Sequence, residues 1–318
     1  MFIRVTGPGA FAGVLTLSVT SIGMVSKLFI ETIEDLDKKI LESLDAAGCN
    51  SFQKIRYGIL PQLFTNFVST VIYRFEINIK DACEQHYKDI GYDKSKLDVT
   101  FENVQARERT QILMDVSNKI GSLVVGTGDL SELALGWCTY NGDQMSMYGV
   151  NASIPKTLVR GILESYAEHH EGLKDVLLDI CDTPVSPELL PPNEDGTIKQ
   201  KTEDKIGSYV VHDFILYYML RHGFGPKKIF DLYVNAKIMH EKNIGVKEPV
   251  VDKQELLKNM DIFYNRFWTQ QFKRSCMPDG VKVGSVSLSP RGDWRMASDA
   301  CQGIWLDELK DLKEKYCK

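Results

Sequence analysis

Hydrophobic residues are distributed unevenly along the chain, and the N-terminal part differs most from the rest. Residues 10–30 (AFAGVLTLSVTSIGMVSKLFI) contain one charged side chain, Lys27. An apolar stretch of this length is about long enough to cross the hydrocarbon core of a bilayer as a helix. We therefore expect a transmembrane helix at 10–30. A buried helix of a soluble domain remains the alternative, because five Ser and Thr residues lie within the stretch.

The next segment has the period of an amphipathic helix. Its apolar residues recur at helical spacing: Ile33, Leu36, Ile40, Leu41 and Leu44. Gly48 breaks this pattern, a second short apolar run follows, and Pro61 comes after it. The pattern predicts two helices joined by a glycine turn, with a stop at Pro61.

Beyond about residue 80 the pattern becomes that of an alternating α/β domain. A helical stripe includes Val104, Ile112, Leu113, Val116 and Ile120. The stretch SLVVGTGDLSELALGW at 122–137 then predicts a strand, a glycine turn and the start of a helix. In an open parallel sheet, such a loop lies where backbone N–H groups can receive a nucleotide. GTGDLS lacks the third glycine of a dinucleotide fingerprint, so this motif alone does not prove a nucleotide site.

Later segments read as a loop and three helices. Residues 189–207 are rich in Pro, Gly and charge and predict a long exposed loop, with a helix beginning at 202–204. Residues 224–245 predict an amphipathic helix, and residues 307–318 predict a charged helical tail.

Composition and charge narrow the function classes. The formal net charge is −5, which gives no basic field to gather nucleic acid, so we expect no nucleic-acid partner. The seven cysteines are widely spread and form no close pairs, which favours a reducing, cytoplasmic setting over a disulfide or zinc framework. His169 and His170 are adjacent without a third ligand nearby in sequence, so a metal bound by histidine is not expected.

The N-terminal part resembles a transporter subunit. Glu42, Gly48, Leu60 and Pro61 stand where the coupling loop of ABC-transporter permeases has its Glu, Gly, Leu and Pro, although the family's second alanine is Leu44 here. The flanking segments TGPGAFAGVLTLSVTSIGMVSKLF and YGILPQLFTNFVSTVIYRFEINI narrow the resemblance to phosphonate-type permeases. It covers about residues 1–79, which we expect to be an all-helical segment with possible membrane contact through 10–30.

The rest of the chain, about residues 80–318, resembles a second family. Its long motifs occur in that family's order: ENVQARERTQILMDVSNKIGSLVVGTGDLSELALGWCTYNGDQMSMYGVNASIPKTLV, DTPVSPELLP, QKTEDKIGSYVVHDF and QQFKRSCMPDGVKVGSVSLSPRGDWRMASDA. They closely resemble the synthetase domain of glutamine-dependent NAD synthetases. The resemblance implies an adenine-nucleotide hydrolase-like (Rossmann-like) α/β fold with a parallel sheet. It also implies ATP-dependent amidation of deamido-NAD to NAD through an adenylated intermediate, with magnesium and with ammonia as the second substrate.

The same resemblance assigns site residues. Those implied for ATP are Thr127, Lys156 and Ser186. Those implied for deamido-NAD are Asn103, Arg107, Glu132, Trp137, Cys138, Thr139, Tyr140 and Lys273. Glu132 is also implied for magnesium. Catalysis of this kind needs cationic clamps and positioning more than a covalent residue, because several negative charges come together in the reaction.

Two parts of the family pattern are missing from the sequence. The pyrophosphate loop Ser-Gly-Gly-x-Asp-Ser occurs nowhere in the 318 residues, and neither does a glutaminase domain with its catalytic cysteine. We therefore expect a parallel sheet that lacks its first strand, exposed apolar surface beside it, and little or no synthetase activity. Any residual reaction would use free ammonia.

Three function classes remain open on the sequence. The first is an impaired NAD synthetase domain that carries a foreign permease-like segment. The second is a non-catalytic nucleotide-binding module that forms a homodimer through helices around residues 102–140. The third is a membrane-attached permease fragment. The two resemblances overlap at 76–79 (EINI), which we expect to form the first strand of the synthetase part.

Overall fold

The computed structural model describes residues 26, 27, 30, 38–183, 202–242, 244 and 250–316. The chain divides into two compact units, Met1–Gln85 and His86–Lys318, which are treated separately below. The expected transmembrane helix at 10–30 lies outside the described residues except at Ser26, Lys27 and Ile30. Of the helices that are described, none combines the length and the apolar character that crossing a bilayer requires.

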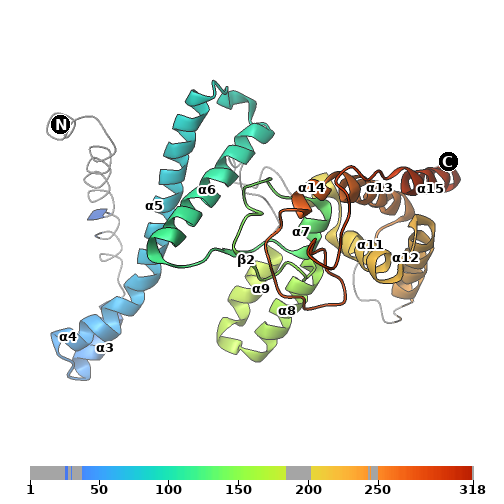
Figure 1. Ribbon diagram of the computed structural model, residues 1–318. Coiled ribbons are helices and arrows are strands. Elements are labelled where there is room, and N and C mark those ends of the chain that lie inside the picture. Colours follow the sequence, from blue (N-terminus) through green and yellow to red (C-terminus); the bar gives the residue numbers. More distant parts are fainter. Residues whose placement is uncertain are drawn as a thin grey trace. The chain divides into compact units, whose positions relative to one another are not determined.

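In the described part of the first unit, all regular secondary structure is helical (Figure 1). Helix α3 (Lys38–Ala46) is followed by α4 (Ser51–Lys54), a π-helical turn (Ile55–Ile59) and the long helix α5 (Leu60–Asp89). The predicted glycine turn is confirmed, because Gly48 lies between α3 and α4 with φ +72°. A backbone angle of this sign is one that glycine adopts without a steric penalty.

Two local predictions for this region are wrong. Pro61 does not end a helix but is the second residue of α5. The helical backbone continues from α4 through the π-helical turn into α5. Pro61 lies just after this turn, where the N–H of Leu60 bonds the carbonyl of Ile55 and the regular i→i−4 ladder is already interrupted. Residues 76–79 are not a strand but part of α5. Two isoleucines in alternation are too short a signal to oppose a helix that runs from Gln62 to Asp89 without Gly or Pro.

The second unit begins with the end of α5 against helix α6. The rings of Tyr87 and Phe101 stack with centroids 5.5 Å apart, and the Tyr87 hydroxyl donates to the carbonyl of Phe101 at 2.9 Å. A 3₁₀ turn (Lys94–Lys96) leads into α6 (Val99–Ile120). The Asp98 side chain caps α6 by accepting from the N–H of Thr100, so the helix predicted from its apolar stripe is confirmed.

The predicted strand, glycine loop and helix are confirmed at 125–135. Strand β1 (Val125–Gly126) precedes helix α7 (Leu130–Leu135) and pairs in parallel with β2 (Tyr148–Gly149). Among the described residues the sheet has these two strands alone. The Val125 side chain on β1 is 51% exposed. Beside β2, a Cβ on Gly280 would lie 2.3 Å from the carbonyl oxygen of Gly149, so only glycine permits this close approach of the chain to the strand.

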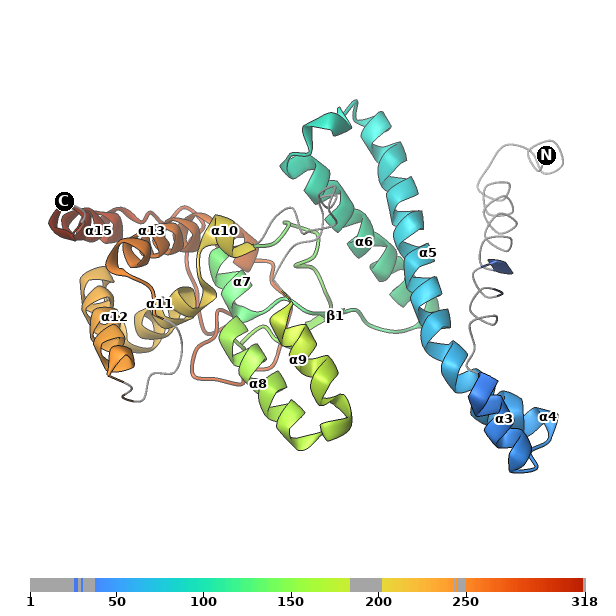
Figure 2. The same cartoon turned by 180° about the vertical axis from the view of Figure 1, so that it is seen from behind.

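Helices make up the remainder of the second unit. Helices α8 (Lys156–His169) and α9 (Lys174–Asp182) lie side by side, joined by a 3₁₀ turn (Glu171–Leu173) (Figure 2). The larger helical layer contains α10 (Thr202–Ile206), α11 (Tyr209–His222), α12 (Pro226–Glu241), α13 (Lys253–Thr269), α14 (Gln271–Arg274) and α15 (Gly303–Tyr316). The helices predicted at 202–204, 224–245 and 307–318 are therefore confirmed.

The core of this unit is centred on α13. Phe263, Tyr264 and Phe267 are fully buried, and α13 packs against α7, α11 and α15. Burial of side chains this large stabilises the layer by roughly 1.5–3 kcal/mol each. This matters for the site, because α7 carries the predicted site residue Glu132 and packs against α13 of this buried core.

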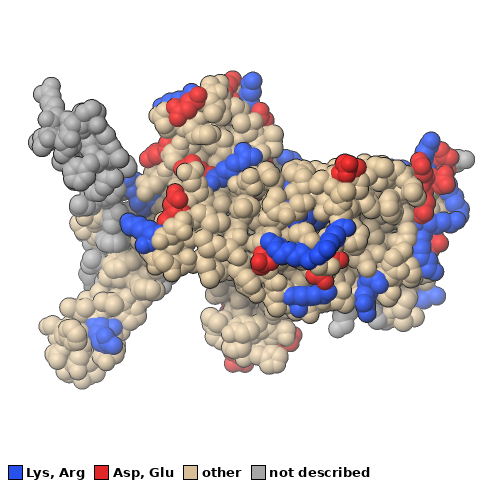
Figure 3. Space-filling model, in the orientation of Figure 1, with Lys and Arg blue, Asp and Glu red and all other residues tan. Residues whose placement is uncertain are grey.

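Charged side chains of both signs share the surface. Over the face shown in Figure 3, the described Lys and Arg side chains are interspersed with Asp and Glu, and both signs gather at the C-terminal helix α15.

Candidate functional site

Helix α7 begins directly after the loop that follows β1, and its first turn is fixed by two carboxylates. Asp129 is the N-cap residue, and its Oδ1 accepts from the N–H of Glu132 at 2.9 Å. Glu132 Oε2 accepts in return from the N–H of Asp129 at 3.2 Å. This reciprocal arrangement is a capping box, which satisfies two N–H groups that the helix itself cannot. It also holds the Glu132 carboxylate close to the loop.

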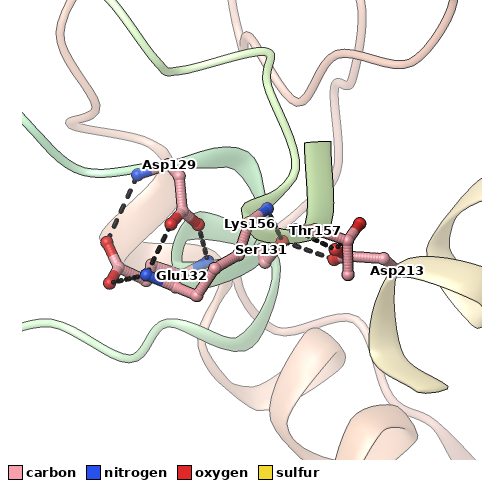
Figure 4. A network of polar contacts seen from close by, with 6 residues as sticks. All are labelled: Asp129, Ser131, Glu132, Lys156, Thr157 and Asp213. Atoms are coloured by element: carbon pink, nitrogen blue, oxygen red, sulfur yellow. Dashed lines mark hydrogen bonds and ion pairs between the residues drawn. The ribbon is translucent and has the colours of Figure 1, made fainter. Parts of the chain in front are cut away.

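Lys156, the first residue of α8, reaches both carboxylates (Figure 4). Its Nζ lies 2.7 Å from Asp129 Oδ2 and 2.9 Å from Glu132 Oε1. The same ammonium stands 5.1 Å from the ring centroid of Tyr209, within range of a cation–π contact. The sequence-predicted residues Glu132 and Lys156 are thus in direct contact. Asp129, which contacts both of them, was not predicted from the sequence.

Burial and charge act together on this pair. Burial raises the pKa of Glu132, and the neighbouring Asp129 raises it further, while Lys156 only partly offsets them. Burial alone would lower the pKa of Lys156, but the carboxylates of Asp129 and Glu132 outweigh that effect and the net shift is upward. A lysine held charged in this way can serve as a fixed positive charge for phosphate oxygens.

A cleft of about 700 Å³ opens beside this first turn. It is lined by segments from α6, from the stretch after α7 and from α13 and α14. All eight residues predicted for the dinucleotide line it: Asn103, Arg107, Glu132, Trp137, Cys138, Thr139, Tyr140 and Lys273. Residues from three separate parts of the sequence therefore meet at one surface hollow of the size that small-molecule sites have.

Hydrogen bonds fix the wall of the cleft after α7. The Thr139 hydroxyl donates to Asn103 Oδ1 at 2.9 Å, and Arg107 Nε donates to the carbonyl of Tyr140 at 3.2 Å. From the opposite side, Lys273 Nζ donates to the carbonyls of Gly136 and Cys138 at 2.8 and 2.7 Å. Burial lowers the pKa of Lys273. The wall is thus tied both to α6 and to α14.

Two aromatic contacts line the same cleft. The Arg266 guanidinium carbon lies 5.1 Å from the ring centroid of Trp137, and the rings of Tyr140 and Phe272 are 5.4 Å apart. Arg266 and Phe272 line the cleft but were not predicted. No local motif could have identified them, because they reach Trp137 and Tyr140 from positions more than a hundred residues away.

Cys138 lines the cleft but is not suited to act as a nucleophile. Burial raises the pKa of its thiol to about 12, and Asp143 contributes to the rise. The thiol donates to Gln144 Oε1 at 3.4 Å. A thiol with this pKa is protonated at neutral pH and is not a nucleophile.

A second, much smaller cavity of about 30 Å³ lies next to the loop after β1. It is lined by Gly126, Gly128, Glu132 and Ser146, among others. The buried Ser146 hydroxyl has no hydrogen-bond partner among the described residues. A space of this size with polar walls suits one water molecule.

The residues predicted for ATP are distributed differently. Thr127 is exposed on the loop between β1 and α7, and Lys156 stands at the first turn of α8 as described. Ser186 lies outside the described residues. The structure therefore brings Lys156 to Glu132, whereas Thr127 lies on the loop that leads to them.

Magnesium is the metal that the resemblance implies. Within the described ranges, no group of three His, Cys, Asp or Glu side chains could hold a metal ion. Glu132 could serve as one ligand of a magnesium ion. Each of its carboxylate oxygens has two lone pairs and one hydrogen-bond partner in the described part of the chain, Lys156 for Oε1 and the N–H of Asp129 for Oε2. Magnesium commonly takes one or two carboxylates and obtains its other ligands from phosphates and water.

An α/β protein in which a capped helix follows a parallel strand, beside a cleft lined by cations and aromatic rings, is of a class suited to nucleotides. The chain belongs to the NAD synthase family, whose family model matches residues 62–242. The model for the inner membrane component of binding-protein-dependent transport systems matches residues 1–85. The two matches overlap at 62–85, within helix α5.

Individual relatives agree with both matches. A glutamine-dependent NAD(+) synthetase of Mycobacterium leprae is 43% identical over an alignment of 254 residues, and the match covers 74% of this chain and 37% of the relative. The phosphite transport system permease protein PtxC of Stutzerimonas stutzeri is 40% identical over 80 residues, 25% of this chain and 29% of the permease. The chain therefore spans little more than a third of the synthetase that it matches.

The fold also matches a solved structure. A glutamine-dependent NAD(+) synthetase from Cytophaga hutchinsonii superposes with a TM-score of 0.53 and 18% identity, over 74% of this chain and 34% of that chain. The chain thus shares the Rossmann-like fold of NAD synthetases, in a helix-rich form with a small parallel sheet.

Proposed function

We propose that this chain binds deamido-NAD in the cleft beside α7 and that its ATP-dependent amidation of this dinucleotide is impaired. The observation that carries the proposal is the meeting of all eight predicted dinucleotide residues at one cleft. The family membership supports the reaction class. Deamido-NAD, ATP and ammonia are accordingly the proposed substrates.

The chemistry of the cleft suits a dinucleotide. Arg107, Arg266 and Lys273 line it and supply cations for a diphosphate and a nicotinate carboxylate. Trp137 and Tyr140 supply flat apolar faces for heterocyclic rings. Glu132 lines both this cleft and the small cavity beside the loop, so it stands at the point where a carboxylate and a nucleotide phosphate would meet.

The proposed reaction has two steps. The nicotinate carboxylate attacks the α-phosphorus of ATP, and pyrophosphate leaves to give an acyl adenylate. Ammonia then attacks the acyl carbon, AMP leaves, and NAD is formed after loss of a proton. Lys156 would neutralise phosphate charge, and Thr127 would offer its hydroxyl to ATP. Bound magnesium, with Glu132 as its protein ligand, would supply further charge neutralisation on the phosphates.

Impairment follows from what the sequence lacks. The Ser-Gly-Gly-x-Asp-Ser loop would provide backbone N–H donors and an aspartate to the pyrophosphate, and it is absent from these 318 residues. We propose that the parallel sheet also lacks the strand that precedes this loop. Stabilisation of developing charge is usually the largest contribution to such catalysis. The eight residues predicted for the dinucleotide are present at the cleft, so we expect binding of deamido-NAD to persist when turnover is lost.

A non-catalytic, self-associating module is the second candidate. The C-terminal half of α6 carries exposed Leu113, Val116 and Ile120, which are 44%, 44% and 67% exposed. Their spacing places them on one face of the helix. An apolar face that is exposed among the described residues favours contact with a second copy, and a homodimer through this region is the corresponding proposal. Membrane contact through 10–30 concerns residues that lie largely outside the described part.

Calorimetric titration of the full chain with deamido-NAD, followed by an NAD-formation assay with ATP, magnesium and ammonium chloride, tests these proposals. We expect saturable binding of deamido-NAD and little or no NAD. Arg107→Gln should weaken binding about tenfold, as expected for loss of one charge-assisted hydrogen bond. Arg221→Gln is the matched control, because Arg221 is exposed at the end of α11 and should bind as the unaltered chain does.

Each result separates the candidates. Absence of binding would remove the ligand proposal, and turnover comparable with a complete synthetase would remove the impairment. Sedimentation velocity without ligand then tests the proposal of self-association. This proposal predicts that the chain is a dimer and that Val116→Glu converts it to a monomer. A monomer before the substitution would refute self-association.

A further inference from the structure

Asp213 of α11 is the meeting point of three helices (Figure 4). Its Oδ1 accepts from the Ser131 hydroxyl of α7. Its Oδ2 accepts from both the hydroxyl and the backbone N–H of Thr157 in α8, at 2.7 and 3.1 Å. Ser131 lies 82 positions and Thr157 lies 56 positions from Asp213 in sequence. None of the three is among the residues expected to touch ligand.

The start of α8 depends on these contacts for its capping. Pro155, its N-cap residue, has no side-chain acceptor to offer. Instead the N–H of Lys156 donates to Ser131 Oγ at 2.8 Å, and the N–H of Thr157 donates to Asp213. The first N–H groups of a helix have no partner within it. Residues of α7 and α11 therefore replace the missing cap, and a carboxylate at this end is also favoured by the helix dipole.

Ser131 acts as a relay between Asp213 and Lys156. A serine hydroxyl has a single hydrogen to donate and lone pairs with which to accept. Because Asp213 accepts that hydrogen, the lone pairs of Ser131 stay turned toward the N–H of Lys156. Without the carboxylate, the hydroxyl is free to rotate and to donate elsewhere.

These backbone contacts also determine where the side chain of Lys156 lies. Its backbone is held through Ser131 and Asp213, while its ammonium lies between Asp129 and Glu132. We infer that Asp213 is a positioning residue, which fixes the first turn of α8 so that the Lys156 ammonium is held at the Glu132 carboxylate. The inference deepens the proposed function, since Lys156 and Glu132 belong to the proposed nucleotide site.

The ammonium itself reports on this arrangement without any ligand. In nitrogen-15 NMR, the signal of a lysine ammonium is sharp when the group is held in ion pairs and is lost to exchange when it is free in water. The Lys156 signal is assigned as the one that disappears in Lys156→Arg. In Asp213→Asn, whose amide can accept but no longer carries charge and presents only one oxygen, we expect this signal to be lost. The backbone amides of Lys156 and Thr157 should exchange with deuterium at least tenfold faster.

Asp204→Asn is the matched control, because Asp204 is an exposed acid of the neighbouring helix α10. It should keep both the ammonium signal and the slow amide exchange. If Asp213→Asn does not fold, Ser131→Ala tests the same link by removing only the relay, and it should give the same loss. A folded Asp213→Asn or Ser131→Ala variant that keeps the Lys156 ammonium signal would overturn the inference. Since no nucleotide is added, a failure of the binding proposal leaves this result interpretable.

Discussion

The sharpest stability prediction concerns Arg274, a cation with no exposed surface at the C-terminal end of α7. Its Nη1 donates to the carbonyls of Ala134 and Leu133 at 2.7 and 3.3 Å, and its Nη2 donates to the carbonyl of Phe267. Its Nε donates to Gln271 Oε1 at 2.8 Å. The last carbonyls of a helix have no partner within it, so Arg274 closes this end of α7 from α14.

Replacement of Arg274 by Met keeps most of the volume and removes the donors. Each buried acceptor that loses its partner costs about 1–3 kcal/mol. The carbonyls of Ala134 and Phe267 lose the guanidinium donor, whereas the carbonyl of Leu133 still accepts from the N–H of Gly136 at 3.3 Å. Burial of the guanidinium is itself unfavourable and lowers the pKa of Arg274 to about 10, so its removal returns part of that cost. We expect a net loss of about 3 kcal/mol in the free energy of unfolding.

Tryptophan fluorescence during guanidinium chloride unfolding measures this loss in the right part of the chain. All four tryptophans, Trp137, Trp268, Trp294 and Trp305, lie in the second unit, so unfolding of the first unit does not contribute to the signal. Arg295→Met is the control, because Arg295 is exposed and its loss should change stability by less than about 0.5 kcal/mol. A loss below about 1 kcal/mol for Arg274→Met, with an unchanged denaturant slope, would refute the capping argument.

Three further predictions rest on single contacts. Gly207→Ala should cost more than about 3 kcal/mol, because φ is +86° and the new Cβ would lie 1.7 Å from Asn259 Oδ1; Gly172→Ala, with open space around it, should be near neutral in the same unfolding assay. Burial lowers the pKa of His212 to about 4, so the unfolded chain takes up a proton at a higher pH than the folded chain. Stability should therefore be intact above about pH 6.5 and fall by about 3 kcal/mol toward pH 4, a fall that His212→Phe should flatten; an equal fall in both would contradict it. Asp252→Ala removes the N-cap that accepts from Glu255 N–H and should cost about 1 kcal/mol, and an unchanged midpoint would count against it.

Local patterns predicted several helices of the second unit, namely α6, α7, α10, α12 and α15. The segment at 224–245 has a helical period and begins with glycine and proline, and it forms α12 with Pro226 in its first turn. The capped start of α7 after a glycine loop is likewise visible in the order of residues. Such signals act within one helical turn, so the sequence alone is sufficient for them.

Predictions failed where a neighbouring segment decided the outcome. Residues 76–79 have strand-forming isoleucines but lie inside α5, because helix propagation adds one bond for each residue and favours continuation. Pro61 was expected to end the second short helix, but the π-helical turn at Ile55–Ile59 leads directly into α5 and the helix continues past the proline. The sites at Thr127 and Lys156 came from resemblance, whereas Asp213 and Arg266 could not be found locally, because their partners are 56 or more positions away.

The two ends of α7 explain why ligand binding and catalysis should separate in this chain. Its first turn is held by the capping box and Lys156, and its last carbonyls accept from Arg266 and Arg274 of the α13 and α14 helices. Both sets of contacts come from residues after 125 and owe nothing to a pyrophosphate loop. Both ends of α7, beside the proposed dinucleotide cleft, are therefore held by contacts that do not involve that loop. The Ser-Gly-Gly-x-Asp-Ser loop proposed to donate to a leaving pyrophosphate does not occur in the 318-residue sequence. The proposed impairment therefore predicts that affinity for the dinucleotide persists where turnover does not.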